Sequence, residues 1–573
     1  MTYSREAILE NLLSKGYFPR ELPPVFSTKD FGQYSSVIIE DWRKAGVYRI
    51  KETKDFGKVG GKKFRGRYSY NNIPSADPEV ISKPKKIYER RNIHLTHPIP
   101  QSLLAKEIAD NWSKIQKWLA RQRYSEDEIR ISERYERAIK GINFSLHRAK
   151  IGYLEATSDW LIRTDISRFY PTIYTHSIPW AAYGKEKVKR SLRTYDGSLG
   201  DRLDTLVRSC NRNQTVGLPI GPETSRILAE IISSRIDDDF FNIKNEIPIA
   251  SVDRLQDDWT VGASSLEASE NILSVISRCY REYGLEINGS KTSVSHILAS
   301  RQDDWKSEIS AFLSHRRGGL HRSRLDEFLK LSLRLQIESP GAPVLNYTLS
   351  IIEGMDVLFN DIEVLESFLL KASVVSPSSM DRICRIILNI DHTSGGLSKD
   401  RLVKRFTALV ERNFENGSIF EVLWILYILR GLKKPIKSAR IMKYAGGVNS
   451  SAVRLLLLDM TSRGLCTTPA PIGLWENEIN EERILSDWSW LSAYEGIRHG
   501  WLADKNNVMA TPFFHAMISR GVAFYDAGKN VRTSASIKRD RRAEIKEQKR
   551  EVAKLLEALR GVDFQVEPGW TEY

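Results

Sequence analysis

The sequence predicts an α+β protein in which an antiparallel sheet with helices is followed by an all-α half. Residues 251–262 read as a strand, an acidic turn and a second strand, and residues 160–165 are an apolar run that ends at an aspartate. From residue 310 to 526 the pattern changes to successive amphipathic helices separated by Gly, Pro and Ser turns.

Length and composition set the broad class. A chain of 573 residues is too long for one core, and 41% hydrophobic with 28% charged residues is typical of a soluble globular protein. The sequence has no apolar run of the roughly 18 residues that a membrane span needs, and its start lacks a signal-peptide stretch. The 4 cysteines have no metal-binding or redox spacing, so we expect a cytoplasmic protein without a membrane partner.

The net charge of +14 and the pI of about 9.3 favour a polyanionic partner. Residues 51–91 concentrate basic side chains between aromatic ones, a composition that suits a surface tracking a nucleic-acid backbone. The alternative is a solvated hairpin. The aromatic residues in this stretch are Phe64, Tyr68, Tyr70 and Tyr88.

The first part of the chain has a mixed pattern. Residues 1–50 are predicted to be helical and then irregular, 51–70 to form a β-hairpin, and 83–98 to form a strand that ends at proline. An amphipathic helix is predicted over 100–123 and another over 126–141.

The acidic pair Asp257-Asp258 is predicted at the tip of the hairpin. Two adjacent carboxylates repel each other, and they become favourable when a divalent cation lies between them and a third carboxylate. The tetrapeptide Gln-Asp-Asp-Trp recurs at 302–305, where Asp303-Asp304 precedes a helical pattern and is interpreted as a helix start. We expect residues 237–239 to end a helix as a solvated acidic face.

Asp165 is the candidate third carboxylate. It ends the apolar run that begins at Trp160, and Pro171 stops the extended segment. A strand-end carboxylate and a hairpin-tip pair would converge on two cations, which clamp the attacking and leaving oxygens of a phosphoryl transfer. The alternative for a lone strand-end aspartate is a turn former, so this hypothesis depends on pairing with Asp257.

Two further segments complete the pattern. Gly217 and Gly221 permit close backbone approach ahead of a helix with buried spacing at Ile227, Leu228 and Ile231. Lys291 follows a strand and turn, where it would neutralise a leaving pyrophosphate or be an ordinary solvated turn residue.

The order of these segments resembles the palm of reverse transcriptases. Four motifs in the right order are a specific signal, and together they cover roughly residues 80–300. The matching stretches are Thr164-Asp-Ile-Ser-Arg-Phe-Tyr-Pro-Thr-Ile173, Gly217-Leu-Pro-Ile-Gly-Pro-Glu-Thr-Ser225, Asp257-Asp258 and Leu285-x-Ile-Asn-x-x-Lys291.

The resemblance implies a right-hand polymerase with fingers and palm, and a metal site that takes Mg²⁺, with Mn²⁺ as an alternative. Asp165 and Asp257 would be metal ligands, Asp258 a second-carboxylate partner, and Ile166 part of the same metal site. Lys291 would assist the leaving group and count with the three aspartates as catalytic.

The resemblance also implies substrate-binding residues. Tyr170 falls where the family has an aromatic gate against the ribose 2′-hydroxyl, and Gly221 with Ile220 would line the nucleotide pocket. Arg90 or Arg91 corresponds loosely to fingers residues that hold the triphosphate.

Two departures from the usual reverse-transcriptase motifs indicate which group of reverse transcriptases the chain resembles. Leu255-Gln256 precedes the acidic pair where Tyr-Val or Tyr-Ala is usual, and Ile220 stands where retroviral and intron enzymes often have Gln. Pro-Ile-Gly-Pro-x-x-Ser is more similar to abortive-infection and other defence-associated bacterial reverse transcriptases. That group often makes DNA without copying a template in the usual manner, sometimes from a protein hydroxyl, for which Tyr34 or Tyr48 are candidates here.

The helical half resembles the HEAT-like extension of the abortive-infection group, which would replace a compact polymerase thumb. No strict sequence period is visible. The basic tail is predicted to be a mixed-sign helix that is solvated or contacts nucleic acid. The expected divisions are an N-terminal fingers region (1–110), a palm (111–305), the helical extension (306–530) and the tail (531–573).

The expected function is that of an RNA-directed DNA polymerase in bacterial antiviral defence, using two metal ions to transfer nucleotides from dNTPs. The expected partners are an RNA template or associated noncoding RNA, the DNA product, and a second copy or a companion defence protein. One alternative is an untemplated or protein-primed nucleotidyltransferase with the same site. The other is a non-catalytic RNA- or protein-binding scaffold built on a relic palm, motivated by Leu255 and Gln256.

Overall fold

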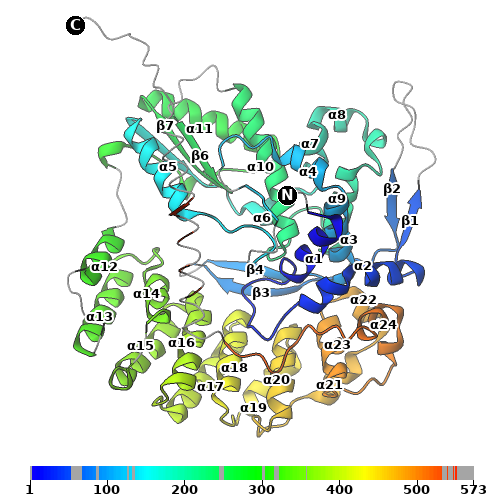
Figure 1. Cartoon of the computed structure of the whole chain (residues 1–573), viewed down its shortest axis with the longest axis vertical. Coiled ribbons are helices and arrows are strands. Elements are labelled where there is room, and N and C mark those ends of the chain that lie inside the picture. Colours follow the sequence, from blue (N-terminus) through cyan, green and yellow to red (C-terminus); the bar gives the residue numbers. More distant parts are fainter. Residues whose placement is uncertain are drawn as a thin grey trace, which may run out of the picture.

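A computed structural model of the chain describes residues 3–52, 67–85, 89–125, 128–131, 136–243, 251–299, 304–314, 320, 322–355, 358–531 and single positions between 539 and 550. Small antiparallel sheets and helices form the first half, and helices alone form the second half of this described part (Figure 1). The mixed first half and helical second half predicted from the sequence are confirmed at this level.

The largest sheet has the strand order β6-β7-β5-β8, with antiparallel neighbours throughout. It is built from β5 (Trp160–Thr164), β6 (Ser251–Leu255), β7 (Asp258–Ala263) and β8 (Ser293–His296). The side chains of Ile162 and Val261 pair across β5 and β7 and are fully buried, so apolar contact holds the two central strands together.

Three helices pack around this sheet, namely α5 (Phe144–Ala156), α10 (Glu223–Ile243) and α11 (Leu266–Arg281). Helix α11 begins where the Ser265 hydroxyl accepts a hydrogen bond from the Ala268 amide at 3.1 Å, and Ile272 and Ile276 on its buried face point into the core. The hairpin β6–β7 is therefore supported on both sides by helices.

The segment between β5 and α10 is helical. It consists of α6 (Phe169–Thr172), α7 (Ser177–Tyr183), α8 (Lys185–Arg190), η1 (Leu192–Tyr195) and α9 (Leu199–Ser209).

The described part of the N-terminal region contains two hairpins and four helices. These are α1 (Arg5–Ser14), α2 (Lys29–Lys44), β1 (Arg49–Glu52), β2 (Tyr68–Asn71), β3 (Glu79–Pro84), β4 (Arg90–Leu95), α3 (Pro98–Asp110) and α4 (Trp112–Leu119). The predicted hairpin over 51–70 is confirmed at its two strands, and residues 53–66 lie outside the described part of the chain.

Three predicted elements in this region were wrong in detail. The segment 83–98, predicted as one strand, instead includes the end of β3 and all of β4, which pair in antiparallel register, and residues 86–88 are not described. The helix over 100–123 is interrupted at Asn111, whose side-chain amide donates to the Glu107 carbonyl at 3.0 Å. In place of the helix over 126–141, Ile131 and Ile139 form an antiparallel bridge, although 126–127 and 132–135 are not described.

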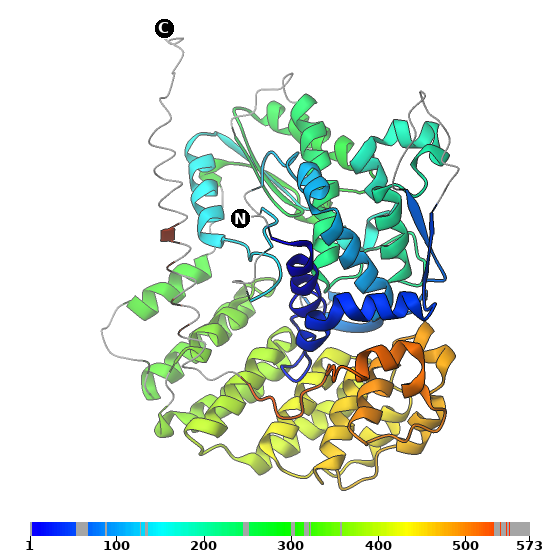
Figure 2. The ribbon, with the colours of Figure 1, turned by 45° about the vertical axis from the view of Figure 1, so that its right-hand side comes forward.

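The helices of the second half follow one another along an arc beneath the mixed half (Figures 1 and 2). Asp304 begins the first of these helices, as its sequence context predicts, whereas Asp303 is not described. They are α12 (Asp304–Ser314), α13 (Arg322–Glu338), α14 (Val344–Glu353), α15 (Ile362–Val375), α16 (Met380–Thr393), α17 (Lys399–Glu415), α18 (Ile419–Leu432), α19 (Ala439–Gly446), α20 (Ser451–Ser462), α21 (Ile472–Glu478), α22 (Glu481–Ser486), α23 (Trp490–Arg498) and α24 (Pro512–Ile518).

The two halves share a continuous hydrophobic core. The indole of Trp42 donates to the Phe513 carbonyl at 3.0 Å, and the indole of Trp424 donates to the Glu21 carbonyl at 2.9 Å. Phe26 and Tyr525 also form an antiparallel bridge. The helical half is therefore packed against the N-terminal segment as well as joined to the first half in sequence.

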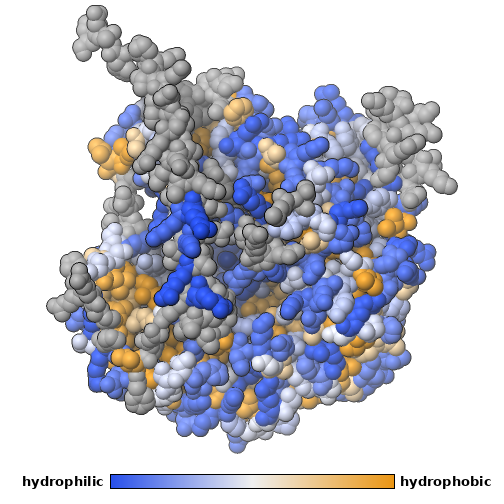
Figure 3. Space-filling view, in the orientation of Figure 1, coloured by the Kyte–Doolittle hydropathy of each residue, from blue (hydrophilic) through white to orange (hydrophobic). Residues whose placement is uncertain are grey.

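The surface in Figure 3 is mainly hydrophilic, and hydrophobic residues gather over α12–α15 at the lower left. Ile337, 76% exposed, and Val375, 55% exposed, are the most open large apolar side chains among the described residues of this stretch of helices. Within the described ranges, no helix has the length and apolar character that crossing a membrane requires.

Candidate active site

The register of the central sheet brings three of the predicted site residues together at one edge. Strand β5 pairs with β7 so that Thr164 lies opposite Trp259, and one further step places Asp165 opposite Asp258. On its other side β5 pairs with β8 so that Arg163 lies opposite Ser293, and beyond this pairing the turn that carries Lys291 brings its ammonium to the Asp165 carboxylate. Residues opposite each other across antiparallel strands project to the same face, so Asp165 and Asp258 share a face and Lys291 adds a positive charge beside them.

The hairpin turn is Gln256-Asp257, one residue earlier than the Asp257-Asp258 turn predicted from the sequence. Leu255 pairs with Asp258, which makes Asp258 the first residue of β7. Gln256 has a left-handed φ of 58°, a conformation that a two-residue hairpin turn requires. As a result Asp257 occupies the tip itself, and Asp258 sits on the strand.

The three carboxylates interact electrostatically. Burial, followed by the charges of Asp258 and Asp165, raises the pKa of Asp257 from 3.8 to about 7. Burial and the Asp165 charge also raise the pKa of Asp258, which remains open to solvent, whereas Asp165 is only 5% exposed. The predicted convergence of the strand-end aspartate on the hairpin tip is thus present in the fold.

Lys291 lies against this cluster. Its ammonium forms an ion pair with the Asp165 carboxylate, and its side chain is 31% exposed. The Thr164 and Thr292 hydroxyls are 2.7 Å apart, and the Asn288 amide donates to the Asp165 carbonyl at 2.6 Å. These bonds fix the 3-10 turn η3 (Gly289–Lys291) beside the end of β5, so Lys291 neutralises a carboxylate of the site in this structure.

The donor set fits a divalent cation. Among the residues that the structure describes, no three His, Cys, Asp or Glu side chains already stand in a metal-holding geometry. Burial first, and then the charges of Asp258 and Asp165, nevertheless raise the pKa of Asp257 to about 7, and hard oxygen donors of this kind suit Mg²⁺ or Mn²⁺. Ile166 has an aliphatic side chain without donor atoms, so only its backbone carbonyl could bind such an ion.

Arg254 supports the hairpin tip from below, a role that the sequence reasoning missed. Its guanidinium is fully buried, donates to Glu230 and Asp237 of α10 at 2.7 Å each, and donates to the Gln256 carbonyl at 2.7 Å. The expectation that residues 237–239 form a solvated face is therefore wrong for Asp237, which is fully buried. Glu230 and Asp237 are seven residues apart on the apolar face of a predicted helix, a spacing that signals a shared buried partner.

Tyr170 lies near the acidic tip. It follows β5 in the short helix α6, its ring is partly buried, and the Asp257 charge contributes to a raised pKa whose main cause is burial. The Tyr170 carbonyl accepts a hydrogen bond from the Leu218 amide at 2.9 Å. This bond ties Tyr170, the predicted gate, to the glycine-bearing loop, the loop that carries Gly217 and Gly221. The gating role itself stays a prediction.

Gly221 needs to be glycine because of the protein that surrounds it. Its φ is 135°, and an added Cβ would lie 2.6 Å from Pro19 Cγ and 3.1 Å from the His94 carbonyl. Ile220 is bound through both backbone groups, since its carbonyl accepts from the His94 amide at 2.8 Å and its amide donates to His94 Nδ1 at 3.0 Å. Burial lowers the pKa of His94 to about 4, which keeps this acceptor nitrogen unprotonated.

Arg90, which is expected to hold the triphosphate, contacts the helical half in this structure, and its triphosphate role stays a prediction. Its guanidinium makes two hydrogen bonds to Glu421 of the helical half, at 2.8 and 2.7 Å, and others to Ser82. Arg91 is exposed on β4 opposite Lys83, where its role stays a prediction. Lys85, which the sequence reasoning did not single out, is a further basic residue that interacts with the carboxylates. Burial and the Lys291 charge lower the pKa of Lys85, while Asp165 opposes that shift.

Aromatic side chains of the predicted nucleic-acid surface also have partners within the protein. Tyr70 is buried and its hydroxyl donates to Glu107 at 2.7 Å, so it is not free to stack on a base. Arg202 lies 3.9 Å from the centre of the Tyr68 ring and covers it. Tyr48, a candidate primer, is 2% exposed and donates to the Ile39 carbonyl at 3.2 Å, whereas Tyr34 is 37% exposed. Phe64 and Tyr88 lie outside the described residues.

Comparisons with known proteins give little further guidance. No protein-family model matches the chain, and no curated protein matches it. Among solved structures, apo telomerase from Candida tropicalis is 12% identical with a TM-score of 0.29, covering 75% of this chain and 73% of that one. Telomerase from Candida albicans in complex with a fragment of telomeric RNA is 12% identical with a TM-score of 0.26, covering 75% and 69%. Scores this low carry no argument, so function is inferred from the site.

Proposed function

We propose that the chain is a metal-dependent nucleotidyltransferase that adds dNTPs to a hydroxyl, and more specifically an RNA-directed DNA polymerase. The observation that supports this proposal is the meeting of Asp165 with Asp257 and Asp258 at the edge of one sheet. A structural role does not account for three repelling carboxylates, because their mutual repulsion only costs stability without a cation. The sequence resemblance to reverse-transcriptase palms supports the finer assignment.

The protein residues would each have a distinct task. Asp165 and Asp257 would hold divalent cations, which supply Lewis-acid stabilisation of the attacking and leaving oxygens when bound. Lys291 would release Asp165 to a cation and turn its ammonium toward the departing pyrophosphate. Tyr170 would close the sugar side of the pocket, next to the acidic tip.

Replacement of one carboxylate tests the proposal. We expect Asp257→Asn to abolish Mg²⁺-dependent incorporation of labelled dNTPs while the thermal unfolding midpoint stays the same or rises. Asp239→Asn is the matched control, because Asp239 lies on α10 and pairs with Arg235 at 2.8 Å instead of facing the cluster. If the Asp257→Asn protein incorporates dNTPs as well as the unmodified protein, the proposal is refuted. If only protein with all three aspartates makes a polymer, the scaffold alternative is excluded.

The product distinguishes templated from untemplated synthesis. Sequencing DNA made with and without a defined added RNA identifies an RNA-directed polymerase if the product is complementary to that RNA. A sequence independent of the added RNA instead identifies the untemplated transferase. DNA covalently attached to the protein after denaturation would identify a protein primer, for which exposed Tyr34 is the better candidate.

We further propose a role in bacterial antiviral defence, supported by the similarity of the Pro-Ile-Gly-Pro-x-x-Ser loop to defence-associated enzymes. Bacteria that express the protein should then restrict phage plating, and those that express Asp257→Asn should not. Equal plating on both strains would count against this role without bearing on the transferase activity.

A further inference from the structure

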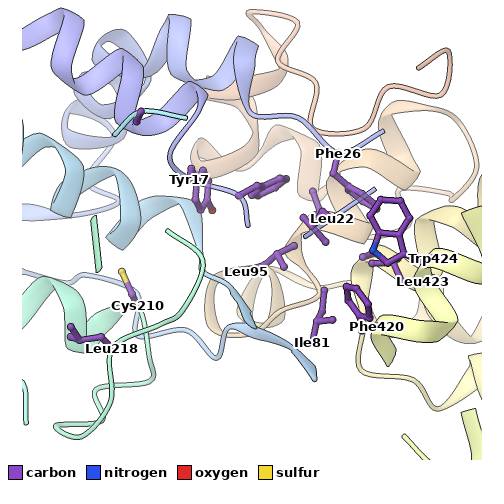
Figure 4. Packing of buried hydrophobic residues seen from close by; sticks show 14 of the residues in the cluster. Tyr17, Leu22, Phe26, Ile81, Leu95, Cys210, Leu218, Phe420, Leu423 and Trp424 are labelled. Carbon is purple, nitrogen blue, oxygen red and sulfur yellow. The ribbon is translucent and has the colours of Figure 1, made fainter. Parts of the chain in front are cut away.

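The β3–β4 hairpin lies between the helical half and the glycine-bearing loop. In Figure 4, Ile81 of β3 lies next to Phe420 and Leu423 of α18, in a buried cluster that also includes Leu95 of β4. The Lys83 ammonium stands over the Phe420 ring, 5.4 Å from its centre. Apolar packing therefore already joins the hairpin to the helical half.

Glu79 adds a polar anchor between β3 and α20. Its carboxylate is 2% exposed and accepts hydrogen bonds from the Ser451 amide at 3.0 Å and the Ser450 hydroxyl at 2.5 Å. The Ser451 amide belongs to the first turn of α20, where helix amides lack partners and the helix dipole favours negative charge. A carboxylate from the first half thus caps a helix of the second.

Arg90 and Glu421 form a second anchor, between β4 and α18. Both guanidinium edges are engaged, because Nη1 and Nη2 donate to Glu421 at 2.8 and 2.7 Å while Nε donates to Ser82 at 2.8 Å. The Glu421 side chain is only 4% exposed. Paired two-point contacts between a guanidinium and a carboxylate fix orientation as well as distance.

The same hairpin is bonded to the substrate side of the molecule. His94 of β4 makes two hydrogen bonds to Ile220, at 2.8 and 3.0 Å, and the Leu218 amide donates to the Tyr170 carbonyl at 2.9 Å. A continuous chain of contacts therefore leads from α18 and α20, through β3 and β4, to the glycine-bearing loop and the predicted gate. Lys85, at the turn of the hairpin, adds positive charge close to Asp258.

We propose that the helical half acts as a clamp that positions the nucleotide pocket, with Glu79 and the Arg90–Glu421 pair as its positioning residues. This inference rests on the proposed nucleotidyl transfer for its kinetic consequence. Since loss of either anchor leaves Asp165 and Asp257 in place, it should weaken dNTP binding more than it slows chemistry.

The kinetic test uses the full-length chain carrying Glu79→Gln, Glu421→Gln, Arg90→Gln, or both of the last two changes. We expect each single variant to raise the KM for dNTP about tenfold with kcat changed far less, as small displacements of a substrate contact do. Arg90→Gln and Glu421→Gln should not be additive, because they remove the same ion pair. A uniform fall in kcat at unchanged KM would overturn the inference.

The matched control is Glu353→Gln. Glu353 is 6% exposed and pairs with Arg382 and Arg385 at 2.8 and 2.5 Å, wholly within the helical half, so its loss should disturb that half without touching the hairpin. Its KM should stay that of the unmodified protein. A rise in KM as large as that of the anchor variants would show general damage to the helical half and overturn the inference.

Hydrogen exchange supplies a readout that does not depend on activity. The backbone amides of Leu218, Ile220 and His94 are hydrogen-bonded, and they should exchange faster in Glu79→Gln and Glu421→Gln than in the control variant. Unchanged exchange in the glycine-bearing loop would overturn the clamp. If the unmodified protein incorporates no dNTP, the proposed function fails, while the exchange data still decide whether the clamp exists.

Discussion

The guanidinium Nε of Arg254 lies 2.7 Å from Oδ1 of Asp237, and neither side chain is exposed to solvent. Arg254 belongs to β6 and Asp237 to α10, and the same guanidinium also holds the Gln256 carbonyl at the start of the acidic turn. The position of the catalytic candidate Asp257 therefore depends on an ion pair buried beneath the sheet.

Arg254→Met should destabilise the fold by about 3–5 kcal/mol, because it leaves Glu230 and Asp237 buried without a counter-charge. Chemical denaturation measures this change. Arg334→Met, which breaks the exposed pairs with Glu308 and Glu338, should leave stability nearly unchanged, because solvent screens charges at the surface. Similar losses in the two variants would contradict the role assigned to the buried pair.

Asp257→Asn should change the pH dependence of stability when divalent cations are chelated. The folded-state pKa of Asp257 is raised from 3.8 to about 7, so folding favours the protonated carboxyl. The stability that this carboxyl contributes is present in full below about pH 4 and is lost as the pH rises through 7. The unfolding midpoint of the Asn variant should therefore rise relative to that of the unmodified protein as the pH increases from 5 to 8. Added Mg²⁺ should raise the midpoint of the unmodified protein at pH 8 and have a weaker effect on the variant, and equal responses would speak against a cation at this residue.

Lys291→Met should lower stability by about 1–2 kcal/mol at low Mg²⁺, because the Asp165 carboxylate loses its charged partner. High Mg²⁺ should restore part of the loss if the ammonium and a cation neutralise the same carboxylates. Denaturant titrations at both Mg²⁺ concentrations measure the effect. Lys330→Met is the control, since its side chain is 73% exposed in a surface pair with Asp326 and its stability should show no dependence on Mg²⁺.

Gly221→Ala should destabilise the protein by about 1–3 kcal/mol, because the residue has a φ of 135° and its new methyl would lie 2.6 Å from Pro19. Thermal unfolding gives the comparison with Gly289→Ala, where no atom lies within 4 Å of an added Cβ. If the two changes cost the same, the close approach of the loop to Pro19 does not explain this glycine.

Tyr170→Val should increase the use of ribonucleotides relative to dNTPs by about tenfold or more, because a smaller side chain leaves room for a 2′-hydroxyl. Incorporation of each nucleotide from matched mixtures measures the ratio. Tyr153→Val, at a side chain that is 39% exposed on α5, should leave the ratio unchanged. An unaltered ratio in the Tyr170 variant would remove this residue from the pocket.

Much of the candidate site was predictable because its signals are local. A run of apolar residues that ends at Asp165 and a two-strand pattern around Asp257 identify sheet edges where carboxylates collect, and the structure brings both to one edge. The contact of Arg90 with the helical half was not predictable from the sequence, for the opposite reason. Its partner Glu421 is 331 residues away in the chain, and no short-range pattern indicates a contact at that separation.

The sequence by itself determined the class of elements, their order, and the acidic residues that could hold a cation, because alternation and charge are properties of neighbouring residues. The tertiary structure alone decided which charges are buried. Asp237 belongs to an acidic run that resembles a solvated helix end, and burial beneath β6 turns it into a partner of Arg254. Burial depends on what packs above a residue, which only the folded chain specifies.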